Sequence, residues 1–204
     1  MALNRYWEDY YQHSDKNVMM SGGGQGLDHP TRKVLWELIP DGSTVLDVAC
    51  CNALMWEQAK RDKKDIKYTG YDIMAETIER NREVYPECEF YSGDASDLDQ
   101  FKDNSFDITN SRHLIDHLPH YASHFIEMYR VAKKRVIITT WRQLRTDTQE
   151  KLRYANLEEG GSWDNQYNQA IMEDFIERII QPVHYEITNE YKDSGNSIIV
   201  VDKV

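Results

Sequence analysis

The segment TVLDVACCNA, residues 44–53, decides the fold. Its first five residues form a short apolar run with one acid, which is typical of a buried strand, and a helical pattern follows over 54–60. A preceding helix is predicted to begin near Asp28, with Pro30 in its first turn, and to end before the turn at 40–42. The segment is therefore the first strand-to-helix step of the chain.

The same alternation of strand and helix continues toward the C-terminus. Extended runs are predicted at 67–71, 87–91, 105–109 and 136–140. Helices are predicted over 74–85 and along the stripe formed by Phe125, Met128, Tyr129 and Ala132. Strands that alternate with helices of this length favour βαβ crossovers and a parallel sheet covered on both faces. The predicted fold class is α/β.

The C-terminal part departs from this rhythm. After a helix that carries Ile171 and Phe175 and stops at Pro182, two extended runs follow at 183–190 and 197–201 without a helix between them. Their turn-rich link predicts a hairpin, so the sheet is expected to end in an antiparallel edge. Two stretches fit no regular element and are expected to be loops or lids. They are the glycine-rich 21–26 and the polar 142–169.

Length and charge limit the classes of protein that remain. With 204 residues the chain is predicted to be a single domain over 1–204, with an aromatic helix and glycine-rich loop at 1–27 and a lid or substrate-side insertion at 142–169. The formal net charge of −11 would repel a polyphosphate backbone, so a nucleic-acid partner is not expected. Oligomeric state has no signal in the sequence.

The sequence lacks long apolar segments and cysteine patterns, which bears on the cellular compartment and on disulfide or zinc-based folds. The N-terminal residues show no apolar core of signal-peptide length, and no later run approaches the ~20 apolar residues of a membrane span. We therefore expect a soluble, cytoplasmic protein without a membrane partner. Three cysteines, two of them adjacent, do not form a disulfide or zinc-finger framework.

Candidate ligand-binding residues lie where the predicted strands end. In an open parallel sheet the ligand binds beyond the carboxyl ends of the strands, where the strand order reverses. The first strand ends at Asp47 and is followed by a loop, and Asp72 ends the second strand about 20 residues after that loop. A carboxylate at this spacing can accept hydrogen bonds from both ribose hydroxyls. The third and fourth strands lead into Gly93, Asp94, Ala95, Asn110 and Ser111.

Each acid also has a local alternative. Asp47 could cap the turn that follows it, Asp72 could cap the helix from Met74, and Asp94 could close an Asx-turn. Their joint placement at strand ends favours ligand contact for the set.

Several motifs in this order resemble class I S-adenosylmethionine-dependent methyltransferases, particularly the small-molecule branch. The segments are VLDVACCNA at 45–53, YTGYDI at 68–73, YSGDASDL at 91–98, FDITNSRHLIDHLPH at 106–120 and EMYRVAKKRVIITTW at 127–141. The resemblance implies a Rossmann-like, doubly wound, mostly parallel seven-stranded sheet with an antiparallel C-terminal hairpin. It also implies in-line transfer of a methyl group from S-adenosylmethionine to a small-molecule acceptor.

The resemblance also implies roles for individual residues. The methionine part of the cofactor would lie against Asp47, Ala49, Cys50 and Asn52. Asp72 would hold the ribose, with Ile73 beside the adenine. The adenine would contact Gly93, Asp94 and Ala95, and the methionine amino group would meet the backbone of Asn110 and Ser111.

The loop after the first strand departs from the family pattern of acid, any, Gly, any, Gly, any, Gly. Ala49, Cys51 and Ala53 occupy the three glycine positions. A non-glycine residue in a left-handed conformation costs roughly 1 to 2 kcal/mol, so either the loop adopts an ordinary conformation or cofactor binding is weakened. The second outcome leaves an alternative function, a catalytically inactive binding or partner protein on the same fold.

Two further alternatives concern this loop. Cys50 and Cys51 could be reactive thiols at a helix N-terminus or, as the composition favours, small buried residues. A nicotinamide-dependent oxidoreductase would need GxGxxG directly after the first strand, and that spacing is absent.

Histidines crowd the region after the fourth strand. His113 and His117 would share a helix face, but Pro119 interrupts it and no acidic third ligand has suitable spacing, so no metal site is predicted. The resemblance implies a structural role for His117. His113 is the catalytic candidate, because an unperturbed pKa of about 6.5 suits a general base; a structural hydrogen-bonding role is its alternative.

Aromatic residues are the candidates for acceptor contact. Tyr6 and Tyr10 fall on one stripe of the N-terminal helix, and Trp163 and Tyr167 lie in the polar insertion. Such side chains either pack in a core or present faces to a sulfonium or an apolar acceptor. We expect them to cover the acceptor pocket.

Overall fold

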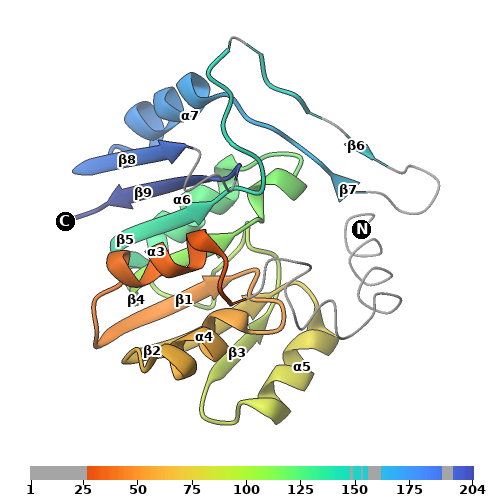
Figure 1. Ribbon diagram of the computed structural model, residues 1–204, viewed down its shortest axis with the longest axis vertical. Coiled ribbons are helices and arrows are strands. Elements are labelled where there is room, and N and C mark those ends of the chain that lie inside the picture. Colours follow the sequence, from red (N-terminus) through yellow and green to blue (C-terminus); the bar gives the residue numbers. More distant parts are fainter. Residues whose placement is uncertain (1–26, 148, 153, 156–161, 190–194) are drawn as a thin grey trace.

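The structure is a computed structural model that describes residues 27–147, 149–152, 154–155, 162–189 and 195–204. Figure 1 shows one twisted sheet with helices on both faces. The strands of this sheet are β1 (Ser43–Val48), β2 (Ile66–Asp72), β3 (Glu89–Ser92), β4 (Phe106–Arg112), β5 (Ala132–Thr139), β8 (His184–Asn189) and β9 (Ser197–Asp202). The predicted α/β class is confirmed.

The strand order is β3-β2-β1-β4-β5-β9-β8. The pairs from β3 through β5 are parallel, whereas β9 pairs antiparallel with both β5 and β8. The order therefore reverses between β1 and β4, and the predicted antiparallel C-terminal edge is confirmed. A ligand crevice belongs outside the carboxyl ends of β1 and β4 in this topology.

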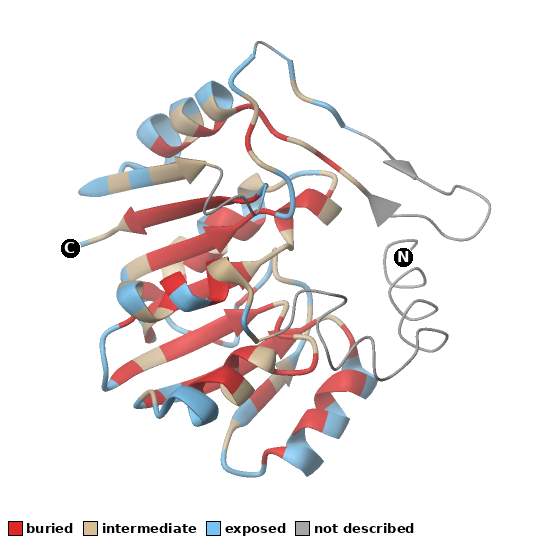
Figure 2. Cartoon of the chain, in the orientation of Figure 1, coloured by how far each residue is buried: buried red, intermediate tan, exposed pale blue. Residues whose placement is uncertain are grey.

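Helices cover the two faces of the sheet separately (Figure 1). One face carries α3 (Pro30–Leu38), α4 (Leu54–Asp62) and α5 (Ala75–Val84). The other carries α6 (Ala122–Val131) and α7 (Gln169–Phe175), which continues into the π-helical turn η3 (Ile176–Ile180). The buried strands between these layers form the core in Figure 2. In the part of the chain described, no helix is long and apolar enough to span a bilayer.

Side chains along β1 alternate between the two faces of the sheet, and this decides which face carries Asp47. Val45 packs into the core beneath α3 and α4, whereas Leu46 and Val48 pack into the core beneath α6. Successive side chains of a strand point to opposite faces, so Asp47 shares the face of Val45.

The observed boundaries differ from the predicted ones at two helix ends. The N-cap of α3 is His29 rather than Asp28; its Nδ1 accepts the amide N–H of Thr31, and Asp28 instead forms an ion pair with Arg61. Ala132 begins β5 instead of extending the helical stripe, because α6 leads into the strand without a loop.

The predicted lid contains a short hairpin. Two small strands, β6 (Tyr154–Ala155) and β7 (Ser162–Trp163), pair antiparallel in a sheet of their own. The division into a domain body, a segment at 1–27 and a lid at 142–169 stays a prediction, since residues 1–26 and parts of the second segment lie outside the described residues.

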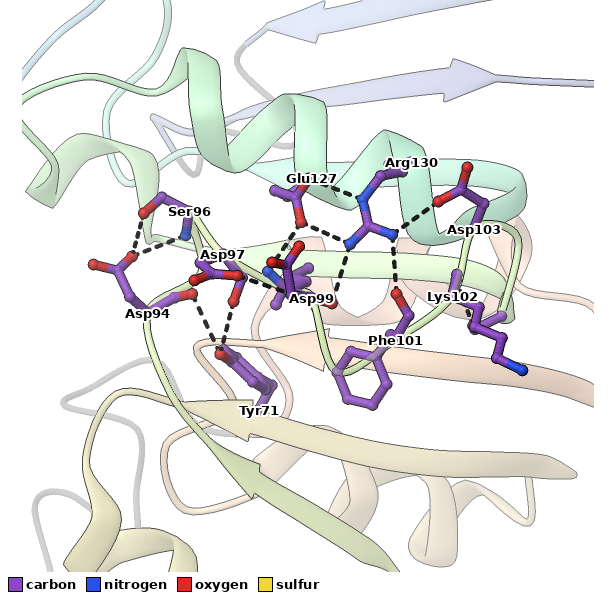
Figure 3. A network of polar contacts seen from close by, with 12 residues as sticks. Tyr71, Asp94, Ser96, Asp97, Asp99, Phe101, Lys102, Asp103, Glu127 and Arg130 are labelled. Atoms are coloured by element: carbon purple, nitrogen blue, oxygen red, sulfur yellow. Dashed lines mark hydrogen bonds and ion pairs between the residues drawn. The ribbon is translucent and has the colours of Figure 1, made fainter.

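The loop after β3 is fixed by one arginine of α6 (Figure 3). Arg130 donates to the carboxylates of Glu127 and Asp103 and to the carbonyl oxygens of Phe101 and Leu98, at distances between 2.7 and 3.0 Å. Glu127 in turn accepts the amide N–H of Leu98 at 2.9 Å. These charge-assisted bonds hold the connection between β3 and β4 against α6.

A second clamp holds the start of the lid. Asp116, in the 3-10 turn η1 (Ile115–His117), accepts the amide N–H groups of Trp141 at 2.8 Å and Arg142 at 3.2 Å, and its own carbonyl accepts the amide N–H of Asn165. Burial raises the pKa of the Asp116 carboxyl to about 7. Asp116 therefore joins η1 to the start of the lid through its carboxylate and to the far side of the lid through its backbone carbonyl.

We expect Asp116→Asn to flatten the pH dependence of stability. The pKa of Asp116 is about 7 when folded and ordinarily 3.8, so the folded state binds this proton more tightly, and stability falls as pH rises from about 4 to 7. One such group contributes at most about 1.4 kcal/mol per pH unit. Urea unfolding across this window should show a shallower slope in the variant. The exposed Asp99→Asn is the control, and an unchanged slope in Asp116→Asn would contradict the assignment.

Candidate active site

The carboxyl ends of β1 and β4 bring Asp47 and Asn110 together. The two residues are in register, and the Asn110 side-chain amide donates to the Asp47 carboxylate at 2.7 Å. The hydroxyl of Tyr68, from β2, donates to its other oxygen at 2.9 Å. Burial raises the pKa of Asp47 to about 6, and the nearby charge of Asp72 adds to the increase. The two predicted acids therefore lie close to each other.

Asp72, at the end of β2, is 6% exposed and joins two neighbouring segments. One carboxylate oxygen accepts the amide N–H of Cys51 at 2.9 Å, and the other accepts that of Met74 at 3.0 Å, just before α5. The second contact is the local capping role noted above. A carboxylate offers about four acceptor sites, so these two bonds leave capacity for further donors.

The loop after β1 keeps a glycine-like backbone without glycine. Ala49, Cys51 and Ala53 all have positive φ, at 62°, 49° and 55°. The expectation of an ordinary loop conformation is therefore wrong. Each residue carries roughly 1 to 2 kcal/mol of strain, which surrounding bonds must offset.

Three hydrogen bonds hold this backbone path. Besides the bond from Cys51 to Asp72, the amide N–H of Cys50 donates to the carbonyl of Tyr71 at 3.0 Å, and the side-chain amide of Asn81 donates to the carbonyl of Cys51 at 2.6 Å. Partners from β2 and α5 therefore impose a conformation that the local sequence disfavours.

Cys50 is a packing residue. Its thiol is buried against Gly70, where an added Cβ would come within 2.9 Å of the sulfur, and burial raises its pKa well above 9.0. The reactive-thiol alternative is therefore disfavoured for Cys50. The neighbouring Asn52 is also buried, and its side-chain oxygen accepts from Arg80. In the described part of the chain, no group of three or more His, Cys, Asp or Glu residues could hold a metal ion.

The connection after β3 needs its glycine. A Cβ on Gly93 would overlap the hydroxyl of Tyr71, which donates at 3.2 Å to the carbonyl oxygens of Asp94 and Asp97 (Figure 3). The Asp94 carboxylate accepts the amide N–H of Ser96 at 2.8 Å, so it closes the Asx-turn given above as its alternative. Its side chain remains 60% exposed and can still face a ligand.

Ile73 and Ala95 complete this predicted group at the second and third strand ends. Both are partly buried, and Ala95 packs against the α6-side core.

Asn110 and Ser111 point in opposite directions at the end of β4. Asn110 shares the face of Asp47, and its side-chain oxygen is buried without a hydrogen-bond partner among the described residues. Ser111 is buried toward the other face, so its predicted role is limited to the backbone. Asn110 therefore presents an open acceptor directly beside Asp47.

His113 follows β4 with a left-handed backbone, φ 59°. Its Nδ1 lies 3.2 Å from Nη1 of Arg112, and because a guanidinium only donates, Nδ1 is assigned as the acceptor and Nε2 as the protonated nitrogen. Burial, reinforced by Arg112 and Arg32, lowers the pKa of His113 well below 6.5. Such a neutral ring is a poor base, which favours the hydrogen-bonding alternative.

The aromatic candidates separate. Tyr6 and Tyr10 lie outside the described residues, and Trp163 is described only through the backbone of β7. Tyr167 is 3% exposed, its hydroxyl meets the carbonyl oxygens of Ile115 and Leu118, and its ring packs on Tyr121. The expectation that Tyr167 covers the acceptor is therefore corrected, since its ring belongs to the core.

Three site residues were not singled out from the sequence. Tyr68 and Arg112 follow the alternation of β2 and β4 toward the face of Asp47, a signal that strand periodicity provides. Arg32 stands one helical turn before Leu35, on the apolar stripe of α3. A charged residue on an apolar stripe is the signal that would have identified it.

Comparison with known proteins agrees with this geometry. Residues 46–139 match the family model described as a methyltransferase domain. A search of curated protein sequences returned no match.

Solved structures share the fold at low sequence identity. The 1,6-didemethyltoxoflavin-N1-methyltransferase of Burkholderia thailandensis, with bound 1,6-didemethyltoxoflavin and S-adenosylhomocysteine, has a TM-score of 0.71 at 16% identity, over 100% of this chain and 88% of that one. A chain from the complex containing the Haloferax volcanii Trm112 methyltransferase activator has a TM-score of 0.66 at 16% identity, with coverage of 92% and 93%. A SAM-dependent methyltransferase of Aquifex aeolicus has 0.60 at 19%, with coverage of 86% and 89%.

Residues 46–139 therefore match a methyltransferase domain, and the chain shares the fold of the S-adenosylmethionine-dependent methyltransferases among the solved structures. The match supports methyl transfer and gives no support to the oxidoreductase alternative. An inactive binding protein on the same fold stays the alternative to an active methyltransferase.

We expect Cys51→Gly to stabilise the protein by about 1 kcal/mol, because glycine adopts positive φ without strain. Chemical denaturation of the ligand-free protein measures the change. Cys88→Gly is the control, since Cys88 has no positive φ. Equal destabilisation by both substitutions would show that the Cys51 backbone is not strained.

Proposed function

We propose that this chain is a class I S-adenosylmethionine-dependent methyltransferase that acts on a small-molecule acceptor and binds its cofactor over the carboxyl ends of β1, β2, β3 and β4. The observation that carries the proposal is the convergence of Asp47, Asp72 and the side-chain oxygen of Asn110 at the point where the strand order reverses. That oxygen has no hydrogen-bond partner among the residues described.

The donors and acceptors present fit the cofactor piece by piece. The free acceptor sites of Asp72 suit the ribose hydroxyls, and Asp47 with the Asn110 oxygen suits the methionine ammonium group. The backbone of Ala49, Cys50, Asn52 and Ser111 would complete the methionine side. Ile73, Gly93, Asp94 and Ala95 would surround the adenine.

The residues mainly position the reactants. Bound S-adenosylmethionine supplies a methyl group that an acceptor lone pair attacks in line, while the electron pair of the breaking carbon–sulfur bond stays on sulfur. Alignment of this kind accounts for a large part of a rate enhancement. A base is needed only when the acceptor atom is protonated. His113 would then orient the acceptor by donating from Nε2, which is buried and has no hydrogen-bond partner among the described residues.

The acceptor side supports a small molecule. The net charge of −11 disfavours nucleic acid, and Trp141, where the lid begins, packs edge-on against His113 at 5.1 Å. The Burkholderia thailandensis structure contains a small-molecule acceptor, which supports the same class here. We place Tyr6, Tyr10 and Trp163 on the acceptor side as part of this proposal.

Label transfer tests the acceptor class. The protein is incubated with methyl-labelled S-adenosylmethionine and a cell extract that ultrafiltration has divided into small-molecule and macromolecular fractions. We expect label in the small-molecule fraction. Incorporation into protein or nucleic acid alone would contradict the proposal.

We expect Asp72→Asn to weaken S-adenosylhomocysteine binding about 10- to 100-fold, since charge-assisted bonds of this kind are worth about 1 to 3 kcal/mol. Isothermal titration calorimetry measures the affinity. The matched control is Asp65→Asn, an exposed acid at the opposite end of β2. Equal affinity in both variants would mean that the ribose lies elsewhere.

We expect His113→Asn, which keeps a side-chain donor, to retain more label transfer than His113→Phe. The rate ratio of His113→Asn to wild type should stay constant across pH 6 to 8, because His113 is neutral throughout when its pKa lies well below 6.5. If wild type alone lost activity as pH fell through this window, His113 would be the general base instead.

A further inference from the structure

Arg32 is a buried cation with no side-chain partner among the residues that the structure describes. It lies in the first turn of α3, is 7% exposed, and its buried Nε has no hydrogen-bond acceptor in that part of the chain. Its guanidinium forms no hydrogen bond or ion pair with any residue that the structure describes. Only its backbone is used, the carbonyl accepting from Gln58 at 3.1 Å.

Such an arrangement is unfavourable in the absence of a ligand. Removing a guanidinium from water costs several kcal/mol unless hydrogen bonds and an opposite charge compensate. Asp47 attracts Arg32 electrostatically, but its two oxygens are already bonded to Asn110 and Tyr68. Packing alone does not require a guanidinium on the apolar stripe of α3.

The surroundings of Arg32 place it at the active site. Asp47, Tyr68 and Cys51 are the groups whose charges act on it. Asp47 lies near the carboxyl end of β1, Cys51 lies in the loop between β1 and α4, and Tyr68 extends from β2 to Asp47. On the side of β4, Arg112 adds a second, partly buried guanidinium, and its pKa is lowered to about 9 by burial and by the charge of Arg32.

The histidines near the two guanidinium groups are neutral. Burial and Arg112 together lower the pKa of His29 to about 4, and the same two causes hold the pKa of His113 well below 6.5. Asp47 is the carboxylate whose charge acts on both arginines, and Asn110 and Tyr68 already donate to its two oxygens. Among the described residues, no carboxylate forms a hydrogen bond with the guanidinium of Arg32.

We infer that Arg32 binds a carboxylate of a ligand in the active site. A guanidinium presents parallel N–H groups that match the two oxygens of a carboxylate. The pairing would therefore satisfy the buried donors of Arg32 and place a negative charge next to its positive one. The inference rests on the proposed placement of the ligand at these strand ends. The carboxylate is either that of the methionine end of the cofactor or that of an anionic acceptor.

The inference separates the effect of Arg32 on binding from its effect on stability. Replacing a buried, unpaired cation by an apolar side chain of similar length is neutral or stabilising in a ligand-free protein. Arg32→Met should therefore unfold at or above the wild-type temperature and bind ligand more weakly. A merely structural arginine would show the opposite, a lower unfolding temperature with unchanged ligand preference.

Calorimetry and thermal unfolding of the full chain test the inference. The probes are S-adenosylhomocysteine and its decarboxylated analogue, which keeps the amine and lacks only the carboxylate. The variants are Arg32→Met and, as control, Lys33→Met, which removes one exposed positive charge from the same helix. If the carboxylate is that of the cofactor, wild type and Lys33→Met prefer S-adenosylhomocysteine at least about tenfold, and Arg32→Met loses the preference.

A second arm covers the acceptor. Wild type saturated with S-adenosylhomocysteine is titrated with benzoate, with benzamide as the uncharged comparison. Stabilisation by benzoate alone, lost in Arg32→Met, assigns the carboxylate to the acceptor. If Arg32→Met matches wild type in both arms, or only lowers the unfolding temperature, the inference is overturned. If wild type binds neither S-adenosylhomocysteine nor its analogue, the proposed cofactor placement fails first.

Discussion

The hydrogen bond from the amide of Cys51 to the carboxylate of Asp72 links the two halves of the candidate site. It fixes the middle of the loop after β1 in a left-handed conformation, and the same carboxylate fixes the start of the segment that enters α5. Ala49 and Ala53, on either side of Cys51, also have positive φ in the loop that this hydrogen bond fixes. The path of the backbone toward the ligand therefore depends on a tertiary contact rather than on glycine.

The buried acids Asp47, Asp72 and Asp116 hold neighbouring groups in position and lower the stability of the folded state. Burial raises the pKa of Asp47, Asp72 and Asp116 alike, so each ionised carboxylate is held at some cost to the folded state. Each is nevertheless bonded to a backbone amide or a side-chain donor from another element. The buried apolar layers in Figure 2 offset the unfavourable free energy of burying these acids.

Periodicity was sufficient to predict the order of the elements, the parallel sheet with its antiparallel edge, and the strand ends at Asp47 and Asp72. These features depend on local patterns that one sequence displays. The loop conformation was not predictable, because alanine and cysteine disfavour positive φ and only contacts from β2 and α5 impose it. The state of His113 and the burial of Tyr167 depend on neighbours distant in sequence, such as Arg32 and Ile115.

The net negative charge of the whole protein and the guanidinium groups near the site act on different ligands. At physiological ionic strength, exposed charges are screened beyond about 8 to 10 Å, so the net charge of −11 acts mainly on large polyanions that touch much of the surface. A small carboxylate that binds at Arg32 instead lies close to the guanidinium groups of Arg32 and Arg112, whose charges are screened less than exposed ones. With Arg32 as the carboxylate site, the same protein would exclude nucleic acid by its surface and retain small anions by its interior.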